Sequence, residues 1–133
     1  MDVYLSEEAR QHLQAQALES ARRGARGLLL GHRRGGRFFV ERIYPCSFGD
    51  FPSDRDYWAL DGIFEGKIIG FYTGGRRAWP AGGKFPPFTF NKLCLKFDAD
   101  PKKGLVLSPA VVEYSDSFKL VPVALAAQAK KKR

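Results

Sequence analysis

The chain has 133 residues, a length that suits one compact domain and is too short for two well-packed ones. Hydrophobic residues make up 44% and aromatic residues 14% of it, a composition that excludes an intrinsically disordered chain. The formal net charge is +8, and no apolar run approaches the roughly 20 residues of a membrane-spanning helix. Because the N-terminus also lacks the basic and then apolar order of a signal peptide, we expect a cytoplasmic protein without a membrane span.

A helix is predicted to begin after Ser6. Serine is a typical N-cap residue, and Glu7 and Glu8 place negative charge at the positive end of the helix dipole. An apolar stripe then follows at helical spacing, made of Leu13, Ala17, Leu18 and Ala21. The helix is predicted to end at typical stop signals, which are Arg22, Arg23 and Gly24.

Two strands are predicted to form a hairpin after this helix. The run Gly-Leu-Leu-Leu-Gly at 27–31 is short, apolar and continuous, which is typical of a central strand covered on both faces. Residues 32–36 are predicted to form the turn. The segment 37–44 is rich in strand-favouring residues and is expected to return antiparallel, ending at Pro45.

The middle of the chain is predicted to alternate between loops and one clear strand. Residues 46–56 carry turn-forming residues and indicate a loop, and 57–60 fit either a short strand or a helical turn. The segment 67–73 indicates a strand. The irregular segment 74–87 that follows is long for a compact domain, and such loops are typically functional or mobile.

The last third is predicted to complete a mostly antiparallel sheet. Leucine and phenylalanine alternate with polar residues in 93–97, and further short strands are expected at 105–107, 110–114 and 118–123. The predicted fold class is therefore α+β, with an N-terminal helix packed on a mixed, mostly antiparallel sheet over residues 1–123. Residues 124–133 are predicted to form a flexible basic tail.

Three of these features, in this order, resemble the MPN/JAB domain of JAMM-type proteins. They are the amphipathic helix, the Gly-Leu-Leu-Leu-Gly run with its hairpin ending at Tyr44-Pro45, and the strand Ile-Ile-Gly-Phe-Tyr at 68–72. The resemblance covers about residues 6–73 and implies the layers of an MPN/JAB or cytidine-deaminase-like domain. In active members of the family, a His-x-His pair follows that strand and a glutamate precedes the Gly-Leu-Leu run, and these residues hold zinc and activate its water.

This metal-binding motif is missing from the chain. Thr73 and Gly75 occupy the positions of the two histidines, and Gly24, Ala25 and Arg26 fill the region of the glutamate. The resemblance therefore implies an inactive relative of zinc isopeptidases, a pseudoenzyme with no metal and no other cofactor. Its expected role is that of a scaffold or protein–protein interaction subunit, either in a larger assembly or as a homo-oligomer.

The segment after the strand is predicted to be the binding site. Its cations are expected to contact an acidic partner and its aromatic side chains to serve as apolar anchors. The predicted binding residues are Arg76, Arg77, Trp79, Lys84 and Phe85. The alternative is a solvated loop whose aromatic side chains fold back to cover a sheet edge.

Two other functions stay open at the level of the sequence. A nucleic-acid-binding protein is the main alternative, because the clusters 22–26 and 33–37 and the basic tail are able to contact phosphates while aromatic rings stack on bases. The second alternative is a hydrolase with an unrecognised site. Cys46 and Cys94 lack the sequence context of a nucleophile and are expected to be reduced, partly buried thiols.

Overall fold

The computed structural model describes residues 1–19, 25–75 and 79–126 of the chain. The elements in this part of the chain are β1 (Asp2–Leu5), α1 (Glu7–Glu19), β2 (Arg26–Arg34), β3 (Arg37–Pro45), α2 (Asp54–Ile63), β4 (Ile68–Gly74), η1 (Ala81–Gly83), η2 (Pro87–Thr89), β5 (Leu93–Asp100), β6 (Gly104–Tyr114), β7 (Phe118–Pro122) and β8 (Ala124–Leu125). Within these residues no helix is long and apolar enough to cross a membrane.

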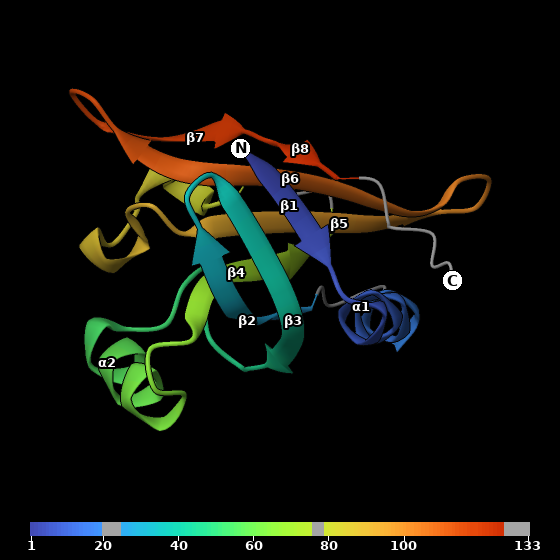
Figure 1. Cartoon of the computed structure of the whole chain (residues 1–133), viewed down its shortest axis with the longest axis horizontal. Coiled ribbons are helices and arrows are strands. Elements are labelled where there is room, and N and C mark those ends of the chain that lie inside the picture. The colour runs from blue at the N-terminus through green and yellow to red at the C-terminus, as the bar shows by residue number, and fades with distance from the viewer. Residues whose placement is uncertain (20–24, 76–78, 127–133) are drawn as a thin grey trace.

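The eight strands of the described residues form one mixed sheet in the order β7-β6-β5-β4-β2-β3-β1-β8. The pairs β1–β3, β1–β8 and β4–β5 are parallel, and the other pairs are antiparallel. The two edge strands, β7 and β8, are joined by Val123 alone, whose N–H donates to the carbonyl of Pro109 at 3.1 Å. The sheet therefore curls until its edges nearly meet, which gives a nearly closed barrel (Figure 1).

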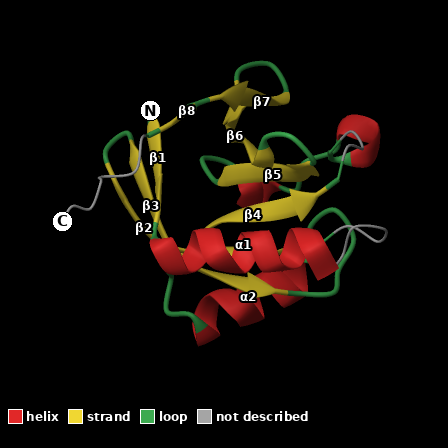
Figure 2. Cartoon of the chain, turned by 90° about the vertical axis from the view of Figure 1, so that its right-hand side faces the viewer, coloured by secondary structure: helices red, strands yellow, loops and turns green. Residues whose placement is uncertain are grey.

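Other parts of the chain cover both faces of this sheet, and both faces therefore carry apolar side chains. The inner face and α1 share one core, in which Leu29, Phe38 and Tyr72 are buried. Helix α1 contacts β3 and β5, and it is seen end-on in Figure 1 and lengthwise in Figure 2. The outer face carries a second core that includes Leu28 and Leu30 and is covered by Tyr57 of α2 and by loop aromatics. The prediction that the 27–31 run is covered on both faces is confirmed.

The fold-class prediction is wrong. The molecule is a strand-dominated, nearly closed barrel with two short helices in its described part, and it is not an N-terminal helix packed on an MPN-like sheet. The strands β1 and β8 were not predicted, yet both pair in parallel, β1 with β3 and β8 with β1. Strands of four and two residues are too short to show a period, and parallel pairing joins segments that are distant in the sequence.

Several local predictions are confirmed. Helix α1 begins after Ser6, whose Oγ accepts the N–H of Ala9 at 3.0 Å. Strands β2 and β3 form the expected hairpin, and β4 and β5 lie where strands were predicted. The ambiguous segment 57–60 is helical and belongs to α2.

Two predictions for the C-terminal part are wrong. Segments 105–107 and 110–114 are a single strand, β6, in which Pro109 lies opposite Leu95 without a break in the pairing to β5. The flexible tail was expected from Ala124 onward, but Ala124–Leu125 forms β8, and the Ala126 N–H donates to the carbonyl of Val3 at 2.8 Å. Residues 127–133 lie outside the described residues.

The two cysteines differ in accessibility, which gives a first testable prediction. Both are free thiols, and burial raises the pKa of each, well above the ordinary value for Cys94, which is 1% exposed. Because the thiolate is the reactive species, Cys46 is expected to react slowly with a disulfide reagent in the folded protein, and Cys94 only after unfolding. Thiol release measured with and without denaturant checks this, and rapid reaction of both thiols in the native protein would contradict it.

Candidate functional site

The predicted binding segment lies at the end of the parallel pair β4–β5. Arg76 and Arg77 are outside the described residues. Trp79 is only 8% exposed, its indole N–H donates to the carbonyl of Asp50 at 3.1 Å, and its ring stacks on Phe51 at 5.4 Å. The structure thus places Trp79 in the second core and not at the surface as an anchor.

The other two residues of that prediction remain closer to solvent. Phe85 is half-buried and its ring centroid lies 5.9 Å from that of Phe51, whereas Lys84 is exposed. Two of the predicted aromatic anchors therefore meet on Phe51 and cover the outer face of the sheet. This arrangement matches the alternative interpretation, in which loop aromatics fold back over the sheet.

An arginine-centred cluster lies beside Thr73, one of the two positions that the sequence resemblance assigned to zinc ligands. Thr73 is buried at the end of β4, and its Oγ1 accepts a hydrogen bond from Nε of Arg26 at 3.3 Å. The guanidinium also pairs with Asp50, with Nη2 and Oδ1 3.6 Å apart. Gly75 follows in the left-handed region (φ 113°), and its N–H donates to the carbonyl of Phe97 at 3.0 Å. A cation thus stands beside Thr73, where a bound dication would be repelled.

A protein holds a metal ion with a set of neighbouring ligand side chains. Within residues 1–19, 25–75 and 79–126, no three His, Cys, Asp or Glu side chains lie close enough together to hold a metal ion. His32 contacts Glu41 instead, and its Nδ1 lies 2.9 Å from the Oε2 of Glu41.

The Arg26 cluster gives a second prediction. Arg26→Leu is expected to lower the free energy of unfolding by about 1–2 kcal/mol, because the buried Thr73 hydroxyl loses its donor and Asp50 loses its cation. The ion pair contributes the smaller part, since both side chains are about one-third exposed, at 31% and 28%. Urea denaturation measures the change. Arg55→Leu on the exposed side of α2 is the matched control, and equal stability of the two variants would contradict the assignment.

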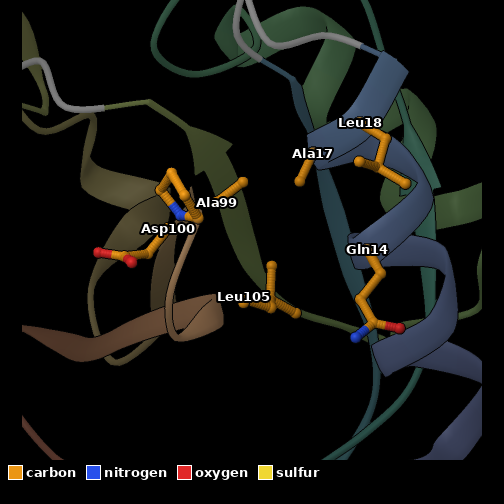
Figure 3. A pocket seen from close by; sticks show the side chains of 8 residues that line it. Gln14, Ala17, Leu18, Ala99, Asp100 and Leu105 are labelled. Carbon is orange, nitrogen blue, oxygen red and sulfur yellow. The ribbon is translucent and has the colours of Figure 1, made fainter.

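A separate apolar groove opens between α1 and the β5–β6 hairpin (Figure 3). Its volume is about 500 Å³. It is lined on the helix side by Gln14, Ala17 and Leu18, and on the hairpin side by Ala99, Asp100, Pro101, Gly104 and Leu105. In Figure 3, Ala17 and Leu18 of α1 and Ala99 and Leu105 of the hairpin stand on opposite sides of the opening.

Leu18 is the most exposed large apolar side chain of the described residues, at 80%. The sequence placed it on the buried stripe together with Leu13 and Ala17. Leu13 is indeed fully buried and Ala17 partly so, but Leu18 lies in the last turns of α1, at the mouth of the groove, where the barrel no longer covers it. The groove escaped the sequence analysis because its two walls are more than 80 residues apart in the chain.

Two lysines occupy the hairpin tip beside this groove, and Asp100 is the charged residue that lines it. The Asp100 carboxylate accepts the backbone N–H groups of Lys102 at 2.7 Å and Lys103 at 3.0 Å, which fixes the tip of the hairpin. The two lysine side chains at this tip are exposed. The groove therefore has apolar walls, and two exposed lysines stand at the hairpin tip next to it, which favours a partner with an apolar side chain and acidic residues nearby.

The architecture defines a class of small domain, the nearly closed mixed β-barrel with a helix packed against β3 and β5. No family model matches the chain, and no curated protein matches it. Among solved structures, it is similar to the solution structure of protein DSY2949 from Desulfitobacterium hafniense, a structural genomics target. The two are 22% identical, the match covers 96% of this chain and 95% of that chain, and the TM-score is 0.65.

This similarity shows a shared fold and nothing about function. The resemblance to the MPN/JAB family is tested by none of these comparisons, so the family assignment stays a prediction.

Proposed function

We propose that this chain is a non-catalytic protein-interaction module that binds an acidic segment of a partner protein. The observation that carries the proposal is Leu18, which is 80% exposed at the mouth of an apolar groove. A large apolar side chain held in water beside a groove has an unfavourable hydration free energy that a bound partner removes. An adaptor or scaffold needs a surface of this kind.

The shape and charge of the groove favour a peptide segment as its occupant. A volume of about 500 Å³ is large enough for apolar side chains of a partner. Lys102 and Lys103 at the hairpin tip favour acidic residues beside those apolar side chains, and such charges act mainly on association rate and specificity. A second copy of this chain would bring the same two lysines to the hairpin tip, which makes a different, acidic protein the better fit.

The Arg26 cluster supports the non-catalytic part of the proposal. A zinc hydrolase needs three protein ligands and a carboxylate beside the metal. Beside Thr73, where the sequence resemblance would have put a zinc ligand, this chain has the Arg26 guanidinium, which contacts Thr73 and Asp50. An arginine stays protonated at all accessible pH values, so it serves neither as a ligand nor as a general base.

The test is capture of partners by the full chain from its own cell extract, with nuclease present and at high salt. Wild type is compared with Leu18→Glu. A protein that the wild type retains and the variant loses, and whose binding maps to an acidic segment, supports the proposal. Identical proteins on both baits would refute it, as would size-exclusion data showing that Leu18 is covered only by a second copy of the chain.

A further inference from the structure

The outer face of the β1-β3-β2 part of the sheet carries a row of stacked rings. Tyr4 and Phe39 have ring centroids 5.0 Å apart at 13°, and Phe39 and His32 have centroids 4.8 Å apart at 16°. The three residues lie directly opposite one another on three neighbouring strands. Tyr4 and Phe39 are half-buried and His32 is exposed, so the row is presented to solvent.

The His32 end of this row lies outside the area of the outer face that the second core covers. The second core lies over Leu28 and Leu30, and the pairing of β2 with β4 ends at Leu30 and Ile68. His32 lies two residues further along β2, where β4 no longer runs beside it. Its ring is held in place by Glu41, with Nδ1 and Oε2 2.9 Å apart. The end of the row is therefore held by a hydrogen bond and exposed to solvent.

Two arginines stand next to the row on the same face. Alternation along the strands places Arg34 with His32 and Arg37 with Phe39, and the two arginines lie directly opposite each other across the hairpin. Like charges in directly opposed positions destabilise a sheet, and an anion between them removes that cost. Asp2 lies opposite Arg37, and the Glu41 carboxylate is engaged by His32.

The third arginine of this hairpin has a different role. The Cζ of Arg33 lies 4.7 Å from the ring centroid of Phe38, and the guanidinium donates to the carbonyls of Gly35 at 2.8 Å and Asn91 at 3.2 Å. These contacts hold Arg33 against the protein. Of the basic cluster 33–37, only Arg34 and Arg37 stand beside the aromatic row.

We propose that this face binds unpaired nucleotides of a single-stranded nucleic acid. A base continues the ring row at His32, and Arg34 and Arg37 contact the phosphates on either side of it. Stacking of this kind tolerates any base, because every base has a π-face, while cations follow the backbone. The proposal goes beyond the protein-binding function and uses no residue of the α1–hairpin groove.

The test is fluorescence anisotropy of the full chain with a labelled single-stranded oligothymidylate and an oligouridylate of equal length. Phe39→Ala is expected to weaken binding by roughly 5- to 100-fold, because a stacking partner is lost. Phe39→Trp keeps a ring at the centre of the row and is expected to retain binding. Replacing both Arg34 and Arg37 by Ala should make the log–log salt dependence shallower by roughly 1.4, the value for two single-strand phosphate contacts.

Controls exclude loss of folding and binding by the basic tail as explanations of a change in affinity. Each variant is checked for an unchanged thermal melting curve, and Tyr114→Ala removes an exposed ring on β6, remote from the row, with no expected effect. A further variant replaces residues 130–133 by serine. The proposal is overturned if the chain does not bind the oligonucleotides, or if binding disappears with the tail change and is unaffected by Phe39→Ala. The proposal would also be overturned if an acidic peptide displaced the oligonucleotide equally well from the wild type and from the Phe39 variants.

Discussion

Replacing Gly31 by alanine is expected to lower the free energy of unfolding by more than about 4 kcal/mol, enough to prevent recovery of folded protein. Gly31 lies at the register shift between β2 and β3. An added Cβ would overlap the carbonyl oxygen of Phe39 and lie 3.1 Å from the backbone nitrogen of Glu41. These are backbone atoms of the partner strand, so relief requires opening the hairpin on which both cores depend.

The matched control for this change is Gly62→Ala in α2, where an added Cβ meets no atom within 4 Å. Alanine has the higher helix propensity, so this variant is expected to be as stable as wild type or more stable by about 0.5–1 kcal/mol. Chemical denaturation of both variants measures the difference. A Gly31→Ala protein with a wild-type midpoint would show that the hairpin register is not the one described.

Leu18→Glu is expected to weaken partner binding by roughly 100-fold while leaving stability within about 0.5 kcal/mol of wild type. The side chain is 80% exposed, so folding does not depend on its burial. In a complex, the new carboxylate would be buried among apolar groups without a partner, which is costly. Titration of the captured partner by calorimetry gives the affinity, and thermal melting gives the stability.

Ile63→Glu is the corresponding control, because Ile63 is 70% exposed at the end of α2 and does not line the groove. It changes the charge by the same amount as Leu18→Glu and also replaces a largely exposed aliphatic side chain. Equal loss of affinity in both variants would mean that the effect is one of net charge, and the groove would no longer be the site.

The net charge of the whole chain differs from that of the described residues. All 14 Asp and Glu are among the described residues, whereas eight of the 22 Lys and Arg are not. These eight are Arg22, Arg23, Arg76, Arg77, Lys130, Lys131, Lys132 and Arg133. The described residues are therefore balanced in formal charge, and binding to anions depends on local arrangements such as the opposed pair Arg34 and Arg37.

Local patterns in the sequence were sufficient for the elements that depend on near neighbours. The N-cap at Ser6, the glycine-bounded leucine run and the hairpin all follow from residues within a few positions of one another. The closure of the barrel does not follow from such local patterns. It depends on β1, on β8 and on Val123 between the two edges, and these contacts join the two ends of the chain. A sequence read locally therefore yields the strands but not their order.

The surfaces proposed here were harder to predict for a related reason. Composition showed that the segment 74–87 is irregular, but not that Trp79 turns inward onto Phe51. Helical periodicity placed Leu18 with the buried stripe, because it carries no information on where the covering sheet ends. The aromatic row depends on strand register, which brings Tyr4 and His32 to either side of Phe39.

Hydrogen exchange of the full chain, alone and with its captured partner, tests the central claim most directly. The account predicts slower exchange at the amides of residues 14–18 and 99–105 on binding, with β4 and the segment 79–90 unchanged. Protection confined to residues 79–90, or to the outer face of β1 and β3, with no change along the α1–hairpin groove, would contradict the assignment of this groove as the protein-binding site.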